Sequence, residues 1–395
     1  MLTRRQVIAG SAGSLLAAAV DAVPALAAAE SDSGLIALPG KKPLIKRSFR
    51  PPNFETPLAD LRQPFTANEA FFVRYHLASI PEIDARAWRL RIGGASAQRP
   101  LELSLAQLRN DFEHVSLAAV NQCSGNKRGL FTPRVPGVQW QNGAIGNATW
   151  TGVRLRDVLR KAGVRDNAVE VVFDGADSPL LEATPDFAKS LPVERALDEN
   201  TLIAFEMNGS PLPHWNGAPA RLVVPGWTAT YWVKHLTQIR IEPQAFDGFW
   251  MQAAYRIPTG MFPGARFASQ ENRETTPITE ILVSSLVTSH ESGARLPRGQ
   301  PAALEGWAWD GGSGIATVEI SRDGGNSWQA ATLTDDHGRF AWRGFRAPLD
   351  TSRPGSMELR VRAAARNGAR QPAQLTPNPS GYHHNAIQTL LLEVT

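Results

Sequence analysis

The most informative stretch of this sequence is Val120-Asn121-Gln122-Cys123-Ser124-Gly125-Asn126-Lys127-Arg128-Gly129, which holds the only cysteine among 395 residues. A lone cysteine has no partner for an intrachain disulfide, and a free thiol in an exported protein is open to oxidation. Positive charge from Lys127 and Arg128 favours the thiolate, which is the form that binds metals. The stretch therefore predicts either a thiolate ligand or a small buried apolar residue, and alone it leaves both open.

The first residues indicate that the chain is exported. Arg4 and Arg5 precede an apolar stretch over residues 8–20, and residues 24–29 include small residues suited to signal-peptidase cleavage. This pattern predicts a twin-arginine signal peptide over residues 1–29 and a periplasmic location, with an ordinary secretory signal as the alternative. The apolar stretch is well short of the roughly 20 residues of a membrane helix, so we expect no membrane anchor.

Composition bounds the class of protein. Apolar residues make up 43% of the chain and charged residues 20%, which is typical of a globular protein. The formal net charge is +4 without a long Lys/Arg tract, so nucleic-acid binding is not expected. Residues 30–70 are rich in proline and polar residues and are expected to form an extended N-terminal arm. A change of pattern near residue 270 predicts two folded parts, residues 71–268 and residues 269–395.

The first folded part has the pattern of a mixed α/β domain. We expect strands at residues 87–92, 169–173 and 221–224. Ser104 is expected to cap a helix that begins at Leu105, and residues 155–162 have the pattern of a helix ended by Gly163.

The second folded part has the pattern of an antiparallel β-sandwich. Strands are expected at residues 281–283, 303–309, 316–321, 328–331, 359–363 and 387–392, and Asp323-Gly324-Gly325 supplies a hairpin turn between two of them. Their number and spacing predict an immunoglobulin-like sandwich without the Cys…Trp…Cys pattern of antibody domains. The predicted fold class is therefore α+β, a mixed α/β domain followed by a sandwich.

Two further segments of the first part could carry chemistry. In the segment over residues 71–76, strand periodicity puts Phe72, Arg74 and His76 on one face, where the arginine and histidine form a compact cationic pair. A solvated strand edge is the alternative for that segment. Residues 216–227 join an amide, a glycine turn and Arg221, and Trp232-Val233-Lys234 follows. This second segment could hold a phosphate or a heterocycle, although each feature alone is common in loops.

Taken in this order, the segments resemble the sulfite oxidase family of molybdopterin enzymes. The resemblance covers nearly the whole chain after the signal. It rests on Phe71-Phe72-Val73-Arg74-Tyr75-His76, Cys123-Ser124-Gly125-Asn126-Lys127-Arg128, Phe205-Glu206-Met207-Asn208-Gly209, Asn216-Gly217-Ala218-Pro219-Ala220-Arg221, residues 225–234, and three sandwich segments at residues 306–309, 323–325 and 378–382.

The resemblance implies a molybdenum ion held by one molybdopterin and one protein thiolate. Cys123 matches the metal ligand of the family. The positions that match its cofactor contacts are Phe72, Val73, Arg74, Tyr75, His76, Cys123, Asp177, Asn216, Arg221, Trp232, Val233 and Lys234. Asn216 departs from the animal enzymes, which have histidine there, and His214 is a less suitable substitute than the asparagine itself.

The resemblance also implies a substrate pocket for sulfite. Arg74, Arg128, His76 and Tyr255 match the family's catalytic positions besides the metal ligand, and Arg339 is a weaker match from the sandwich. Planar arginine side chains suit a small oxyanion. The implied reaction is a two-electron oxidation of sulfite to sulfate, the activity of a sulfite dehydrogenase.

Partners follow from the resemblance and from missing motifs. The sequence has no Cys-x-x-Cys-His motif, so we expect no haem in this chain and an external c-type cytochrome that takes the electrons one at a time. The sandwich resembles the family's dimerisation domain and implies a homodimer, although some relatives pair instead with a cytochrome subunit.

Four other functions stay open at this point. The first is the sulfane dehydrogenase of a thiosulfate-oxidising complex, which uses the same fold and cofactor. The others are a sulfoxide reductase, which lacks the sandwich, a secreted binding protein without activity, and a cysteine protease with a paired histidine.

Overall fold

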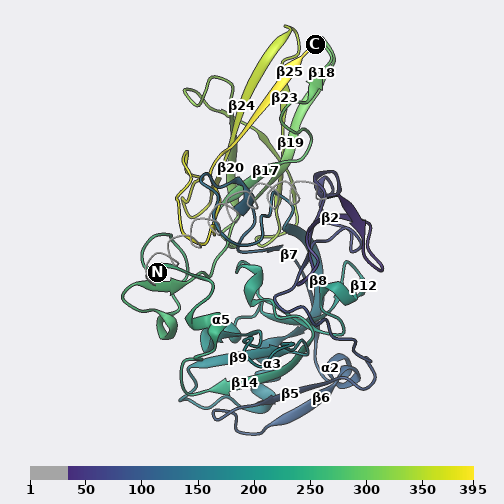
Figure 1. Ribbon diagram of the computed structural model, residues 1–395, viewed down its shortest axis with the longest axis vertical. Coiled ribbons are helices and arrows are strands. Elements are labelled where there is room, and N and C mark those ends of the chain that lie inside the picture. The colour runs from purple at the N-terminus through teal and green to yellow at the C-terminus, as the bar shows by residue number, and fades with distance from the viewer. Residues whose placement is uncertain (1–33) are drawn as a thin grey trace, which may run out of the picture.

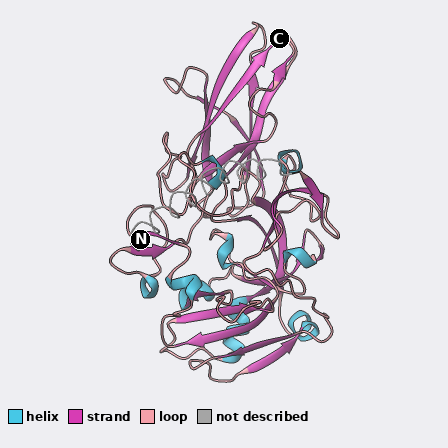
Figure 2. Ribbon diagram, in the orientation of Figure 1, coloured by secondary structure: helices cyan, strands magenta, loops and turns pink. Residues whose placement is uncertain are grey.

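The computed structural model describes residues 34–395 and shows an elongated molecule in which most regular structure is strand (Figures 1 and 2). The predicted signal peptide over residues 1–29 lies outside the described residues. In the part of the chain that the structure describes, no helix has the length and apolar character needed to cross a membrane.

The N-terminal arm is more ordered than expected. Its strands β1 (Leu35–Ala37), β2 (Pro43–Ser48) and β3 (Asn53–Glu55) form an antiparallel sheet with β4 (Val73–Arg74). Leu44 and Phe54 from the arm are fully buried against Val73 and Tyr75. This apolar contact removes both side chains from water and explains why residues 34–55 pack as a sheet on the first domain.

The first domain contains two five-stranded sheets and short helices. One sheet has the order β10 (Ala188–Pro192), β9 (Glu170–Gly175), β14 (Leu236–Glu242), β5 (Arg89–Gly93), β6 (Leu101–Ser104). The other has the order β12 (Ser210–Pro211), β11 (Leu202–Met207), β8 (Ile145–Arg154), β7 (His114–Gln122), with β13 (Arg221–Val223) paired to β11. The helices are α2 (Leu105–Asn110), α3 (Leu155–Ala162), α4 (Val193–Ala196) and α5 (Phe249–Gln252).

Both helices predicted from the sequence are confirmed. Ser104 accepts a hydrogen bond from the backbone N–H of Gln107, and the Gln107 side chain closes a capping box. Gly163 ends α3 with a φ of 73°, a conformation that glycine adopts without steric cost. The apolar face of α3 is fully buried in the main core of the domain.

The second domain is the predicted sandwich of two sheets. One sheet has the order β17 (Ser284–Val287), β19 (Ala302–Trp309), β23 (Arg343–Leu349), β22 (Thr332–Asp336). The other has the order β18 (Arg295–Leu296), β25 (Gln388–Val394), β24 (Gly355–Ala365), β20 (Ile315–Ser321), β21 (Gln329–Ala330). The remaining elements are β15 (Arg256–Pro258), β16 (Thr275–Pro277) and the 3₁₀ helices η1 (Leu58–Leu61), η2 (Arg128–Leu130), η3 (His214–Asn216), η4 (Ala229–Tyr231) and η5 (Ala268–Gln270).

One predicted strand of the sandwich is wrong. Residues 281–283 lie outside the sandwich sheets, and the strand β17 begins only at Ser284. The backbone N–H of Ile281 instead donates to the carbonyl of Gly226 in the first domain, so this segment links the two domains.

Direct hydrogen bonds fix the sandwich to the strand that ends at the cysteine. The indole N–H of Trp309 donates to Gln122 Oε1 at 2.6 Å, directly before Cys123. Lys127 is fully buried and its Nζ donates to the carbonyl of Ser285 at 3.1 Å. Val120 bonds through its backbone to Phe340 at 2.9 Å. The loop that carries Cys123 is therefore held from both domains.

The arm reaches the first domain's interior through Lys41. Its Nζ donates to the carbonyls of Asn68 at 2.6 Å and Phe71 at 3.0 Å and to Asn216 Oδ1 at 2.7 Å. Because the ammonium group only donates, Asn216 must turn its oxygen toward Lys41. Burial lowers the pKa of Lys41 to about 7, against the opposing effect of Glu69.

We predict that Lys41→Met changes the pH dependence of stability. The pKa of Lys41 is lower in the folded protein than in the unfolded chain, so the unfolded chain binds more protons between pH 7 and about 10. The free energy of unfolding of the wild type, measured relative to Lys41→Met, should therefore rise with pH in that window, by up to about 1.4 kcal/mol per pH unit.

Urea unfolding at several pH values measures this difference. Lys42→Met is the matched control, because Lys42 is the exposed neighbour of Lys41, and it should give a flat difference. A flat difference for Lys41→Met as well would contradict the prediction.

Candidate active site

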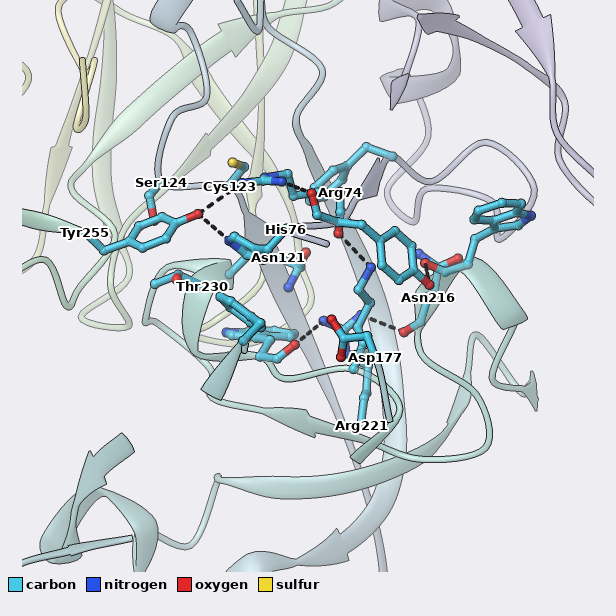
Figure 3. Close-up of a pocket in the computed structure, with 17 residues that line it drawn as sticks. Arg74, His76, Asn121, Cys123, Ser124, Asp177, Asn216, Arg221, Thr230 and Tyr255 are labelled. Carbon is cyan, nitrogen blue, oxygen red and sulfur yellow. Dashed lines mark hydrogen bonds between the residues drawn. The ribbon is translucent and has the colours of Figure 1, made fainter. Parts of the chain in front are cut away.

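Most of the predicted site residues converge on one cavity in the first domain (Figure 3). It lies where β4, the end of β7, η3, β13 and η4 meet. The lining residues are Phe72, Arg74, Tyr75, His76, Asn121, Cys123, Ser124, Asp177, Phe187, Trp215, Asn216, Arg221, Ala229, Thr230, Trp232, Lys234 and Tyr255.

Eleven of the predicted residues line this cavity, and three do not. Strand alternation places Phe72, Arg74 and His76 on the cavity, as expected, while Val73 points into the apolar cluster on the other side of β4. Val233 is buried in the main core. The side chains of both valines therefore pack against apolar neighbours and do not line the cavity.

Sequence reasoning did not single out the other six lining residues. Asn121 and Ser124 flank Cys123, so their position in the same stretch was an available signal. Phe187, Trp215, Ala229 and Thr230 carry no such signal, since only the folded chain brings them together.

Cys123 is presented by the turn that follows β7. Its backbone N–H donates to the carbonyl of Ala144, and its carbonyl accepts from the N–H of Asn126, both at 2.9 Å. The side-chain oxygen of Asn126 in turn accepts from the N–H of Ala144 at 3.0 Å. Lys127 completes the turn with a φ of 66°. The side chain of Cys123 is only 6% exposed and faces the cavity.

Arg74, His76 and Tyr255 form a hydrogen-bonded group on one wall (Figure 3). The hydroxyl of Tyr255 lies 2.5 Å from His76 Nε2 and 3.3 Å from the Arg74 guanidinium. His76 stacks on Phe187 with ring centroids 3.6 Å apart. Burial, followed by the charges of Arg74 and Lys234, lowers the pKa of His76 well below its usual value. His76 is therefore neutral near pH 7, and Arg74 supplies the positive charge of this wall.

Two further basic side chains, Arg221 and Lys234, line the cavity. Arg221 donates to the carbonyls of Asn216 and Trp232, both at 2.9 Å, and Lys234 donates to the carbonyl of Arg74 at 2.6 Å. Burial lowers the pKa of Arg221 to about 9 and that of Lys234 well below its usual value. Asp177 is the single carboxylate in the lining, and burial raises its pKa to about 6. The cavity wall therefore has an excess of positive charge.

Several polar atoms in the wall lack a partner among the described residues. They are Asn121 Nδ2, Ser124 Oγ, Arg221 Nε and Thr230 Oγ1, and all four are buried. Native proteins leave few buried polar atoms unsatisfied. Together with the excess charge, these atoms fit an anionic group rich in hydrogen-bonding atoms.

A metal in this cavity would have few protein ligands. Within residues 34–395, no group of three or more His, Cys, Asp or Glu side chains is placed to hold a metal ion. Cys123 offers one soft sulfur ligand, which suits a redox metal whose other ligands come from a cofactor. The lining residues thus fit the predicted combination of one thiolate and a pterin-bound metal.

Arg128 is placed differently from the expectation that it lines the substrate pocket. Its guanidinium donates to the carbonyls of Ser380 at 2.8 Å and Val138 at 3.3 Å, and it lies 5.1 Å from the ring centroid of Tyr382. Tyr382 stacks on Tyr255 with centroids 5.5 Å apart. Arg128 therefore contacts the cavity lining through Tyr382 and Tyr255 and does not itself line the cavity.

Two candidate residues from the sequence, Arg339 and His214, lie away from the cavity wall. Arg339 packs over Phe340 and lines a separate groove with Arg195 and Glu280. His214 faces His235 and does not line the cavity. The weaker match of Arg339 to the substrate pocket is not supported by this placement.

Comparison with known proteins identifies two families along the chain. Residues 76–250 match the oxidoreductase molybdopterin binding domain, and residues 275–393 match the Mo-co oxidoreductase dimerisation domain. Both matches agree with the order of the two folded parts.

Known relatives cover most of the chain. Mitochondrial sulfite oxidase of Macaca fascicularis is 36% identical over 82% of this chain and 60% of its own length, and sulfite oxidase of Gallus gallus is 34% identical over 84% of this chain and 73% of its own length. This chain therefore spans about 60% of the length of the mammalian relative.

A solved structure shares the whole arrangement. The crystal structure of the sulfane dehydrogenase SoxCD from Paracoccus pantotrophus matches with a TM-score of 0.73 and 26% identity, over 93% of this chain and 91% of that chain. The family matches agree with the molybdopterin site that the lining of the cavity indicates. The chain belongs to the sulfite oxidase family of molybdopterin oxidoreductases.

Proposed function

We propose that this protein is a periplasmic sulfite dehydrogenase that passes electrons singly to an external c-type cytochrome. The observation that carries the proposal is that the buried Cys123 and the half-buried Arg74 line the same cavity, whose wall is rich in basic side chains. The Arg4-Arg5 pattern supports export by the twin-arginine route to the periplasm. The dimerisation-domain match supports a homodimer.

Different residues of the cavity would bind the metal and the pterin of the cofactor. Cys123 would hold molybdenum. Arg221 and Lys234 would bind anionic groups of one molybdopterin, and the side-chain amide of Asn216 would donate to one of its hydrogen-bond acceptors. When bound, the cofactor supplies a metal that accepts two electrons from sulfur. Burial strengthens each hydrogen bond and charge interaction that these residues make with it.

The wall with Arg74, His76 and Tyr255 would bind the substrate. Sulfite is an anion with three oxygens, and the guanidinium of Arg74 can donate two parallel hydrogen bonds to such a group. The hydroxyl of Tyr255 accepts from Arg74 and lies beside neutral His76, so its proton can be shared with His76 or with a substrate oxygen. This wall orients sulfite and stabilises negative charge as sulfate forms.

A sulfane dehydrogenase is the second candidate. It is favoured by the similarity to SoxCD, which extends over 93% of this chain. The substrate of that reaction is a sulfur atom bound to a carrier protein, whereas free sulfite needs no carrier. Assays with sulfite and with thiosulfate plus its carrier protein therefore separate the two functions.

We predict that molybdenum-loaded protein oxidises sulfite and that Cys123→Ser abolishes this activity. Loss of the soft thiolate should lower the rate at least about 100-fold, since it removes the protein ligand of the metal. Sulfite-dependent reduction of ferricyanide measures the rate, and metal analysis measures the molybdenum content of both proteins. Ser116→Ala, at the exposed beginning of the same strand β7, is the control and should keep full activity.

Two outcomes would reject this proposal. A wild-type protein without near-stoichiometric molybdenum, when made in a host that synthesises the cofactor, is not a molybdenum enzyme. Full activity in Cys123→Ser would show that Cys123 is not the ligand.

A second prediction compares the two arginines. Arg74→Gln should raise the KM for sulfite about 10- to 100-fold, because a charged hydrogen bond to the substrate contributes about 1.5–3 kcal/mol. Arg128→Gln should raise it less than about fivefold, because Arg128 lies behind Tyr382. Steady-state kinetics with molybdenum content measured in parallel distinguishes substrate binding from cofactor loss. Equal KM changes in the two variants would place both arginines in the substrate pocket.

A further inference from the structure

Exposed apolar side chains gather beside the cavity. Leu180 and Leu181 are 68% and 70% exposed, and Phe249 at the beginning of α5 is 46% exposed. These are three of the eight large apolar side chains that are exposed within residues 34–395. Adjacent leucines that point into water are unusual and often mark a binding surface.

The loop that carries both leucines is part of the cavity wall. It connects Asp177 to Phe187, and both of these residues line the cavity. The loop is also tied to α5, because the indole N–H of Trp250 donates to the carbonyl of Pro185 at 3.3 Å and its ring packs on Phe187. The loop that carries Leu180 and Leu181 is therefore attached to the helix that begins with Phe249, at the edge of the site.

Aromatic contacts connect this region to the interior. The ring of Phe249 lies 5.2 Å from that of Trp250, which lies 4.9 Å from His76 and 6.2 Å from Tyr255, centroid to centroid. A molecule bound on Phe249 is thus separated from the cavity wall by a single side chain, that of Trp250.

The charge of this region differs from that of the whole chain. Residues 174–187 contain four carboxylates and residues 243–255 contain one, and neither segment has a lysine or an arginine. The whole chain has a net charge of +4. Of these carboxylates, Glu182, Asp186 and Asp247 are exposed, and each lies within five residues of one of the exposed apolar side chains in the sequence.

We propose that the rim, defined as Leu180, Leu181, Glu182, Asp186, Asp247 and Phe249, docks a small basic electron-transfer protein. Exposed apolar side chains together with exposed carboxylates complement a partner whose surface has an apolar patch and lysines. Small interfaces of this kind suit redox partners that must bind and leave quickly. The proposal rests on the proposed function and names the surface at which its electrons leave.

The electron balance fits repeated encounters at this surface. Sulfite and one water molecule give sulfate, two protons and two electrons. Each oxidised partner accepts one electron, so two partner molecules must dock in turn for every sulfite consumed.

The test compares a protein acceptor with a small acceptor. Leu180→Ser combined with Leu181→Ser should lower kcat/KM for a basic cytochrome c at least about fivefold, while sulfite-dependent reduction of ferricyanide stays unchanged. Leu391→Ser is the matched control, because Leu391 is 51% exposed on β25 in the sandwich, and it should leave both rates unchanged.

The charges are tested separately. Glu182→Gln, Asp186→Asn and Asp247→Asn together should weaken the fall of kcat/KM with added salt, since exposed charges are screened over about 10 Å at 0.1 M salt. An acidic cytochrome should react more slowly than the basic one with the wild type, and this difference should shrink in the triple variant.

A binding measurement keeps this test independent of turnover. Calorimetric titration of oxidised basic cytochrome c at low ionic strength should show binding to the wild type and to Leu391→Ser, and at least fivefold weaker binding to the leucine variant. Equal binding and equal cytochrome rates in all variants would overturn the docking proposal. Lack of sulfite-dependent ferricyanide reduction would reject the proposed function, and the binding data would still decide whether the rim is a docking surface.

Discussion

Burial of positive charge without matching carboxylates is the constraint on which the site depends. Arg74, Arg221 and Lys234 line the cavity, whereas Asp177 is the single carboxylate in the lining. Removing a charge from water is costly unless hydrogen bonds or an opposite charge compensate. This cost disfavours the charged forms of Arg221 and Lys234 and therefore lowers their pKa values. An anionic ligand that binds only the folded protein would relieve it and stabilise the fold.

The fold tolerates this charge by supplying backbone carbonyls. Arg221 and Lys234 each donate to carbonyls of neighbouring loops, and Lys41 does the same from the N-terminal sheet. These bonds also fix the segments relative to one another, because Lys234 and Lys41 bind residues that are distant in the sequence and Arg221 joins η3 to the end of η4. The same interactions therefore hold the cations in place and shape the cavity.

Local patterns predict much of this structure, and long-range packing accounts for what they miss. Alternation places Phe72, Arg74 and His76 on the cavity, and the capping signals of Ser104 and Gly163 define two helices. The same alternation shows that Val73 faces away, which family resemblance alone does not reveal. Residues such as Phe187 and Thr230 could not be predicted, because only the tertiary fold brings them to Cys123. The arm is similar, since its strands depend on a partner, β4, that comes later in the chain.

The position of Arg128 shows that the two domains share the site. Its backbone follows Cys123 in the first domain, yet its side chain binds the carbonyl of Ser380 and the face of Tyr382 in the second. Asn378 holds that segment by bonding both the N–H and the carbonyl of Tyr382. Tyr382 in turn stacks on Tyr255, whose hydroxyl contacts Arg74 and His76. The sandwich therefore contacts the Arg74, His76 and Tyr255 side of the cavity through Tyr382, and this contact helps to fix the position of Tyr255.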